Sequence, residues 1–104
     1  MLYKKFILVS QPDNPNVGTF VYGLVNQHED LLVTFSEIVH GGGWWHKDDI
    51  KKEMTLYGRS VDFGDPDLNY LNRIPKELLG YTFLYAPDWG EDENTLSLKD
   101  VEWF

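Results

Sequence analysis

The chain has 104 residues, of which 42% are hydrophobic, 25% charged and 15% aromatic, the composition of one globular domain over residues 1–104 and not of a disordered segment. Its formal net charge of -8, with only nine basic residues, argues against direct nucleic-acid binding, which depends on clustered Lys and Arg. The absence of cysteine excludes disulfides and thiolate metal sites.

The N-terminal segment is the only one that resembles a targeting signal. Its apolar run, residues 6–9, is four residues long, whereas a signal peptide needs roughly 7–15 apolar residues and a membrane span ~20. We therefore expect a soluble cytoplasmic protein that does not enter a membrane.

Two strands are predicted first. Residues 2–9 alternate in a β pattern, and residues 12–16 have turn composition. Residues 19–25 form the second predicted strand, with Phe20, Tyr22 and Leu24 on one side. Residues 27–30 are polar enough to link it to a third strand as an antiparallel neighbour, with His28 in solvent. One face of the first predicted strand carries Tyr3, Lys5, Ile7 and Val9, and the other face carries Leu2, Lys4, Phe6 and Leu8.

The third predicted strand covers residues 31–40. One of its two faces is apolar except for Glu37. The Glu37 carboxylate must lie at the sheet rim or find a partner, because an unpaired buried charge is very costly.

Two short helices are predicted after this strand. Ile50, Met54 and Tyr57 recur at helical spacing, which predicts a helix over residues 48–57 that ends at Gly58. Residues 66–74 form the second, with Asp65 as its cap. Residues 75–80 then add one more turn, with Leu78 and Leu79 buried and Gly80 as its exit.

The C-terminal part returns to β structure. Residues 81–86 predict a strand with aromatic side chains at 81, 83 and 85 that belong to the core. Residues 87–95 predict an exposed acidic loop, and residues 96–103 a final strand. The expected fold class is α+β, a mainly antiparallel sheet of four to five strands with the two short helices on one face.

The junction after the third strand is the candidate site. An apolar run ends there in three consecutive glycines, which need a structural reason because glycine costs about 0.5–1 kcal/mol inside regular structure. They form either a flexible turn or bulge, with Trp44 and Trp45 packed on the core or the sheet edge, or a bare backbone that a ligand approaches closely. The candidate ligand-binding residues are His40, Gly41, Gly42, Gly43, Trp44, Trp45 and His46.

One motif resembles that of a known family. The run from His40 to Trp44 is similar to the oxyanion-hole signature of lipases and esterases of the α/β-hydrolase fold, and residues 58–62 approach its nucleophile elbow. The elbow's last glycine is Asp62 here, and 104 residues cannot hold that sheet. No functional residue is carried over from this resemblance.

We therefore expect a small acidic binding or interaction module, with a protein or small-molecule partner, rather than an enzyme. No catalytic residue, metal or cofactor is assigned, and the oligomeric state stays open. One alternative is a metal-assisted hydrolase using His40, His46 and a carboxylate such as Glu37, Asp48 or Asp49. Another is an acidic mimic or inhibitor of a nucleic-acid-binding protein, which would gather its carboxylates on one face.

Overall fold

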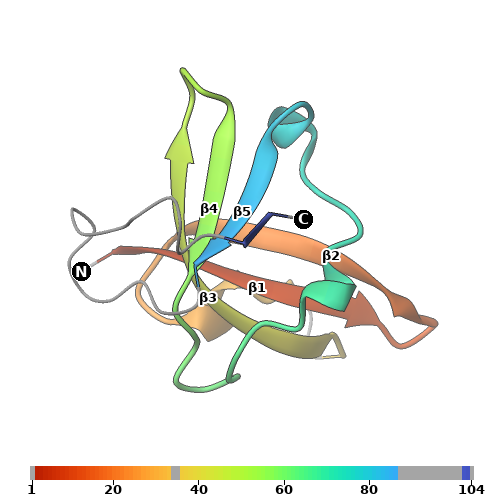
Figure 1. The fold of residues 1–104 in the computed structure, drawn as a ribbon. Helices are drawn as coiled ribbons and strands as arrows, with labels where there is room; N and C mark the ends of the chain where they lie inside the picture. The colour runs from red at the N-terminus through yellow and green to blue at the C-terminus, as the bar shows by residue number, and fades with distance from the viewer. Residues whose placement is uncertain (1, 34–35, 87–101, 104) are drawn as a thin grey trace.

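A computed structural model describes residues 2–33, 36–86 and 102–103 of the chain, the last two by their backbone. Its main feature is one six-stranded sheet in the order β2-β1-β3-β4-β5-β6 (Figure 1). Neighbouring strands are antiparallel except β4 and β5, which are parallel. The predicted sheet is thus confirmed in part, as a mixed sheet. The strands are β1 (Tyr3–Gln11), β2 (Asn14–Val25), β3 (Ile38–Asp48), β4 (Glu53–Tyr57), β5 (Thr82–Ala86) and the two-residue β6 (Glu102–Trp103).

The described residues contain no α-helix, so the prediction of an α+β fold with two short helices is wrong. Three one-turn 3-10 helices connect the strands instead: η1 (His28–Leu31), η2 (Leu68–Tyr70) and η3 (Lys76–Leu78). None of the helices in this part of the chain is long and apolar enough to cross a membrane.

The segment predicted as a helix over residues 48–57 is a β-hairpin. The Asp48 carboxylate accepts hydrogen bonds from the Ile50 and Lys51 backbone N–H groups, each 3.0 Å long, and this closes the turn between β3 and β4. Met54 and Leu56 point into the core while Ile50 lies almost fully exposed. Strand geometry puts Met54 and Leu56 on one face, and the helical spacing that included Ile50 was coincidental.

The second predicted helix is also replaced, by a segment that follows the edge of the sheet. Asp67, and not Asp65, caps the short turn η2 by accepting from the Asn69 N–H. Beyond it, the Arg73 carbonyl accepts from the Phe20 N–H (2.9 Å) and the Arg73 N–H donates to the Gly18 carbonyl (3.0 Å). Pairing with β2 satisfies this backbone and covers part of an open strand edge.

Three further predictions are corrected. Leu78 in η3 is fully buried as predicted, but Leu79, which follows η3, is 68% exposed. His28, predicted in solvent, is buried in η1. β1 lies between β2 and β3, so the predicted pairing of those two strands across residues 27–30 is wrong.

The third strand starts later than predicted. β3 begins at Ile38 and Leu31 ends η1, so the row that was expected to contain Glu37 is not a strand face. The Glu37 carboxylate accepts from the Gln11 side-chain amide (3.1 Å) and from the Val33 N–H (2.6 Å). Of the two alternatives for this carboxylate, the sheet rim or a partner, the structure shows hydrogen-bond partners, although Glu37 lies outside the strand. The acidic loop predicted over residues 87–95 lies outside the described residues, as does most of the strand predicted over residues 96–103, of which Glu102–Trp103 pair with β5.

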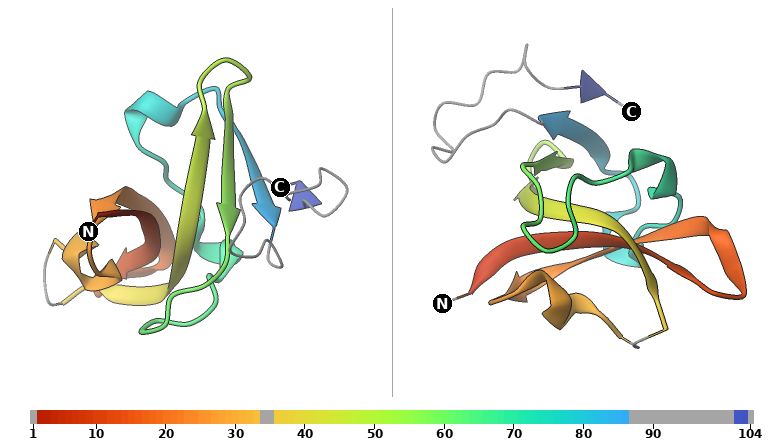
Figure 2. Two further views of the ribbon diagram at one scale, coloured as in Figure 1. Left: turned by 90° about the vertical axis from the view of Figure 1, so that its left-hand side faces the viewer. Right: turned by 90° about the horizontal axis from the view of Figure 1, so that it is seen from below.

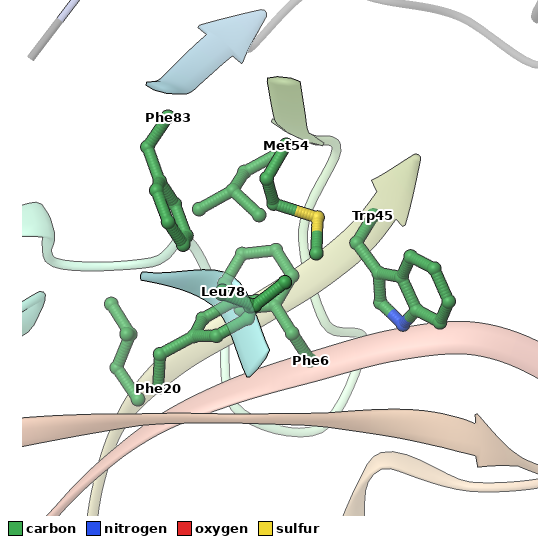
Figure 3. Packing of buried hydrophobic residues seen from close by; sticks show 8 residues of the cluster. Phe6, Phe20, Trp45, Met54, Leu78 and Phe83 are labelled. Atoms are coloured by element: carbon green, nitrogen blue, oxygen red, sulfur yellow. The ribbon is translucent and has the colours of Figure 1, made fainter. Parts of the chain in front are cut away.

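The main core lies inside a strongly curled sheet (Figures 2 and 3). The rings of Phe20 in β2 and Phe83 in β5 have centroids 5.5 Å apart, although three strands separate β2 from β5. In a flat sheet the two strands would be about 19 Å apart. The two faces of β1 are both covered, with Phe6 and Leu8 in this core and Ile7 and Val9 in a second cluster, as the alternation predicts.

Candidate functional site

The seven candidate residues lie in the middle of β3, between β1 and β4. The sequence pattern predicts that the glycines form a turn or bulge between a strand ending at His40 and a helix. Gly42 and Gly43 pair instead with Ile7 and Phe6 of β1, and Trp44 pairs with Tyr57 of β4. The site is therefore built on central strands of the sheet.

The glycines permit close approach, but of the protein's own backbone. His40 and Gly41 together lie opposite Leu8, because the register shifts between Ile7 and Val9; this is a β-bulge, with Gly41 at φ +98°. A Cβ at Gly41 would collide with the Asp65 carbonyl, one at Gly42 with the Phe6 carbonyl, and one at Gly43 would lie 2.6 Å from the Tyr57 carbonyl oxygen. These positions are filled by the fold itself.

The two tryptophans lie on opposite faces of β3, as consecutive strand residues must. Trp45 is 9% exposed and belongs to the main core, where its indole N–H donates to the Gly23 carbonyl (3.3 Å). Trp44 packs against Tyr57 and its neighbours on the other face and is half-buried. The structure does not bring the two indoles together on one surface.

Trp44 is part of a small group of rings around a lysine. Tyr3 meets the Trp44 ring edge-on with centroids 5.5 Å apart. The Lys5 ammonium lies 5.4 Å from the Trp44 centroid and 5.2 Å from the Tyr3 centroid, distances that permit cation–π attraction. We call Tyr3, Lys5 and Trp44 the aromatic–lysine cluster.

His40 is held between a serine and a tyrosine. Its Nε2 lies 2.7 Å from Ser10 Oγ, and its ring stacks on Tyr70 with centroids 3.5 Å apart. Partial burial lowers the pKa of His40 against the opposing effect of nearby Asp67. A neutral imidazole beside a serine hydroxyl is the start of a nucleophile–base pair. However, Ser10 is only 1% exposed, so the pair acts as a buried polar contact and not as a catalytic one.

The histidines and carboxylates that the structure describes do not assemble into a metal site. Within residues 2–33 and 36–86, no three side chains of His, Asp or Glu come close enough to hold an ion. Asp48 closes the hairpin turn, and Asp49 accepts from the Tyr81 hydroxyl and lies 3.6 Å from the Lys47 ammonium. Asp48 and Asp49, the candidate metal ligands at the hairpin, thus both have partners within the protein.

The other carboxylates of the described residues occur in several elements. They lie in the β1–β2 turn, in η1, in the β3–β4 hairpin, in the loop over residues 62–67 and in η3. Their spread along the chain does not by itself place them on one face or on several, so the acidic-mimic alternative stays a prediction.

No family model matches the chain. The comparisons with curated proteins and with solved structures also find no match. Any functional interpretation therefore rests on the geometry of this chain alone.

Sequence reasoning missed the partners of Trp44. The alternation of β1 correctly places Tyr3 and Lys5 on one face, but no local signal indicates that β3 lies beside β1 with Lys5 opposite Trp44. It also failed to predict the hydrogen bond of His28, a residue of η1 whose ring N–H donates to the Gly43 carbonyl (2.8 Å). Both contacts join segments that are distant in sequence.

Proposed function

We propose that this chain is a small binding module and that its ligand contacts the Trp44 side of β3, at the aromatic–lysine cluster. The observation that carries the proposal is the position of the Lys5 ammonium between two aromatic rings at the surface. The ligand chemistry that fits is an apolar or aromatic group bearing a carboxylate, whether it belongs to a peptide or to a free small molecule.

The cluster has unused capacity for such a ligand. The Lys5 ammonium has three donors and gives one to the Asn26 carbonyl at 2.8 Å. No carboxylate of the described residues lies within 4.0 Å of it. Tyr3 is 36% exposed, so an apolar group has an aromatic residue to contact beside the charge.

The cluster is also held rigidly, which lowers the entropic cost of binding. Lys5 and Trp44 are directly paired across β1 and β3. The Trp44 indole packs closely against Gly58, where a Cβ would lie 2.9 Å from Trp44 Cδ1. The rings therefore sit on central strands instead of on a loop.

The test is a heteronuclear NMR titration of the full chain with capped tripeptides, Leu-Glu-Leu and the matched Leu-Gln-Leu. We expect the acidic peptide to bind more tightly, with the largest shifts at the amides of Tyr3 and Lys5 and at the Trp44 indole. In Lys5→Gln the preference for the acidic peptide should disappear, because the charge that selects it is gone.

Lys51→Gln is the control, since it removes an exposed lysine from the hairpin turn, outside the cluster. The proposal fails if the two peptides cause the same shifts in the unsubstituted chain, or if Lys5→Gln and Lys51→Gln behave alike.

A further inference from the structure

A cavity of about 350 Å³ opens at the far end of the β1–β2 ladder. Its apolar surface includes Val9 and Val21, which belong to the second core cluster and thus lie on the opposite face of the sheet from the main core. Val17 and Val33 add to this apolar lining. The volume falls within the range of roughly 300–1,000 Å³ that is typical of small-molecule sites.

Opposite charges line this cavity from its two sides. Glu37 immediately precedes β3, on one side of β1, whereas Arg73 pairs with Thr19 on the outer side of β2. Three strand-to-strand steps separate these backbones, about 14 Å measured along the curled sheet, so the direct distance is shorter. Both residues line the cavity together with the valines.

The acidic side is fixed in place. The Glu37 carboxylate is held by hydrogen bonds from the Gln11 amide and the Val33 N–H, which fix its position where it lines the cavity. Asp13, in the turn between β1 and β2, brings a second carboxylate to the same cavity. A ligand ammonium is the group that this side would hold.

On the basic side of the cavity, the backbone of Arg73 is held in place and its guanidinium is available to a ligand. The Arg73 N–H and carbonyl both bond to β2, which anchors the backbone without using the side chain. No carboxylate of the described residues lies within 4.0 Å of the guanidinium. Its planar set of donors matches a carboxylate.

We infer that this cavity binds a small zwitterion whose ammonium and carboxylate are separated by an apolar segment, of the size of a short peptide with free ends. The ammonium lies against Glu37 and Asp13, the carboxylate against Arg73, and the apolar segment on the valines. An extended tripeptide spans about 10 Å, which suits charges on opposite sides of a site this wide. The site shares no residue with the aromatic–lysine cluster.

The experiment uses three tripeptide probes, Ala-Val-Ala with free ends, its N-acetyl form and its C-terminal amide, titrated into the full chain by NMR. Because two carboxylates and one guanidinium line the cavity, N-acetylation should weaken binding most, by about tenfold, the effect of losing one hydrogen-bonded charge. Amidation should weaken binding less, by about threefold.

Two variants assign the ends. In Glu37→Gln the penalty for N-acetylation should shrink, and in Arg73→Gln the penalty for amidation should disappear. Glu29→Gln and Arg59→Gln are the controls, because both remove exposed charges that do not line the cavity. Glu37→Gln could loosen the segment that the Glu37 carboxylate holds. Arg73→Gln then still tests the inference, because Arg73 is anchored to β2 by its backbone and not by its side chain.

Equal binding of the three probes, no binding at 10 mM probe, or Arg73→Gln retaining the preference for the free carboxylate would each overturn the inference. Shifts centred on Trp44 instead of on the cavity would overturn it as well.

Discussion

At the scale of single residues, the glycine run of β3 shows how bare backbone is used in this protein. Gly41 supplies the positive φ of a bulge, and Gly42 and Gly43 let neighbouring carbonyls approach where a side chain would collide. The sequence indicates that three adjacent glycines need a reason. The reason found in the structure is packing against Asp65, Phe6 and Tyr57.

Gly41→Ala should therefore destabilise the fold more than Gly80→Ala. Both glycines have a positive φ, +98° and +91°, so both substitutions carry the strain of that conformation, about 1–2 kcal/mol. Only at Gly41 does the new Cβ also meet backbone; at Gly80 nothing lies within 4 Å. Urea unfolding of the two variants measures the difference, and equal losses would contradict the steric explanation.

His28 should make the stability depend on pH. Burial lowers its pKa from the ordinary 6.5, more than its bond to the Gly43 carbonyl raises it. Between the folded and unfolded pKa values the unfolded state binds more protons, so stability is complete above pH 6.5 and falls as the pH falls below it.

The measurement is the free energy of unfolding in urea at pH 7.5, 6.5 and 5.5. His28→Gln keeps an N–H donor for the carbonyl but does not titrate, so its stability should fall less on acidification. The pKa of His40 is lowered too, but His40 is present in both proteins and its contribution cancels. The same pH dependence in both would exclude His28 as the cause.

At the scale of elements, the errors of prediction have a common cause. Residues 48–57 have apolar side chains at helical and at strand spacing, and the choice depends on what covers them. Met54 and Leu56 meet a core formed by other strands, and Ile50 meets solvent. Residues 66–74 likewise pair with an exposed strand edge. Tertiary contacts overrode local periodicity in both segments.

The element η3 offers a test of how the core is closed. Leu78 is 0% exposed and belongs to the main cluster, whereas its neighbour Leu79 is 68% exposed. Leu78→Ala should cost about 2–5 kcal/mol of unfolding free energy, the usual effect of a cavity in a core. Leu79→Ala should change it by less than about 0.5 kcal/mol. Thermal and urea unfolding measure both, and comparable losses would mean that η3 does not seal the core.

At the scale of the whole molecule, the curl of the sheet decides which surfaces exist. It encloses Trp45 with Phe20 and Phe83, and it leaves Trp44 on the outer face beside Tyr3 and Lys5. The single surface expected from adjacent tryptophans is divided because consecutive residues of a strand point to opposite faces. The cavity at the end of β1 and β2 arises from segments around residues 13, 37 and 73, which no local pattern connects.

The sequence by itself determined which residues of β1 share a face and which aromatic side of β5 faces the main core, because successive side chains of a strand point to opposite faces. It also determined the absence of disulfides and the acidic balance. Only the tertiary structure decided the strand order, the hairpin over residues 48–57 and the use made of the glycines. These depend on contacts between distant segments, whose free energy exceeds the small local preferences that a sequence pattern reports.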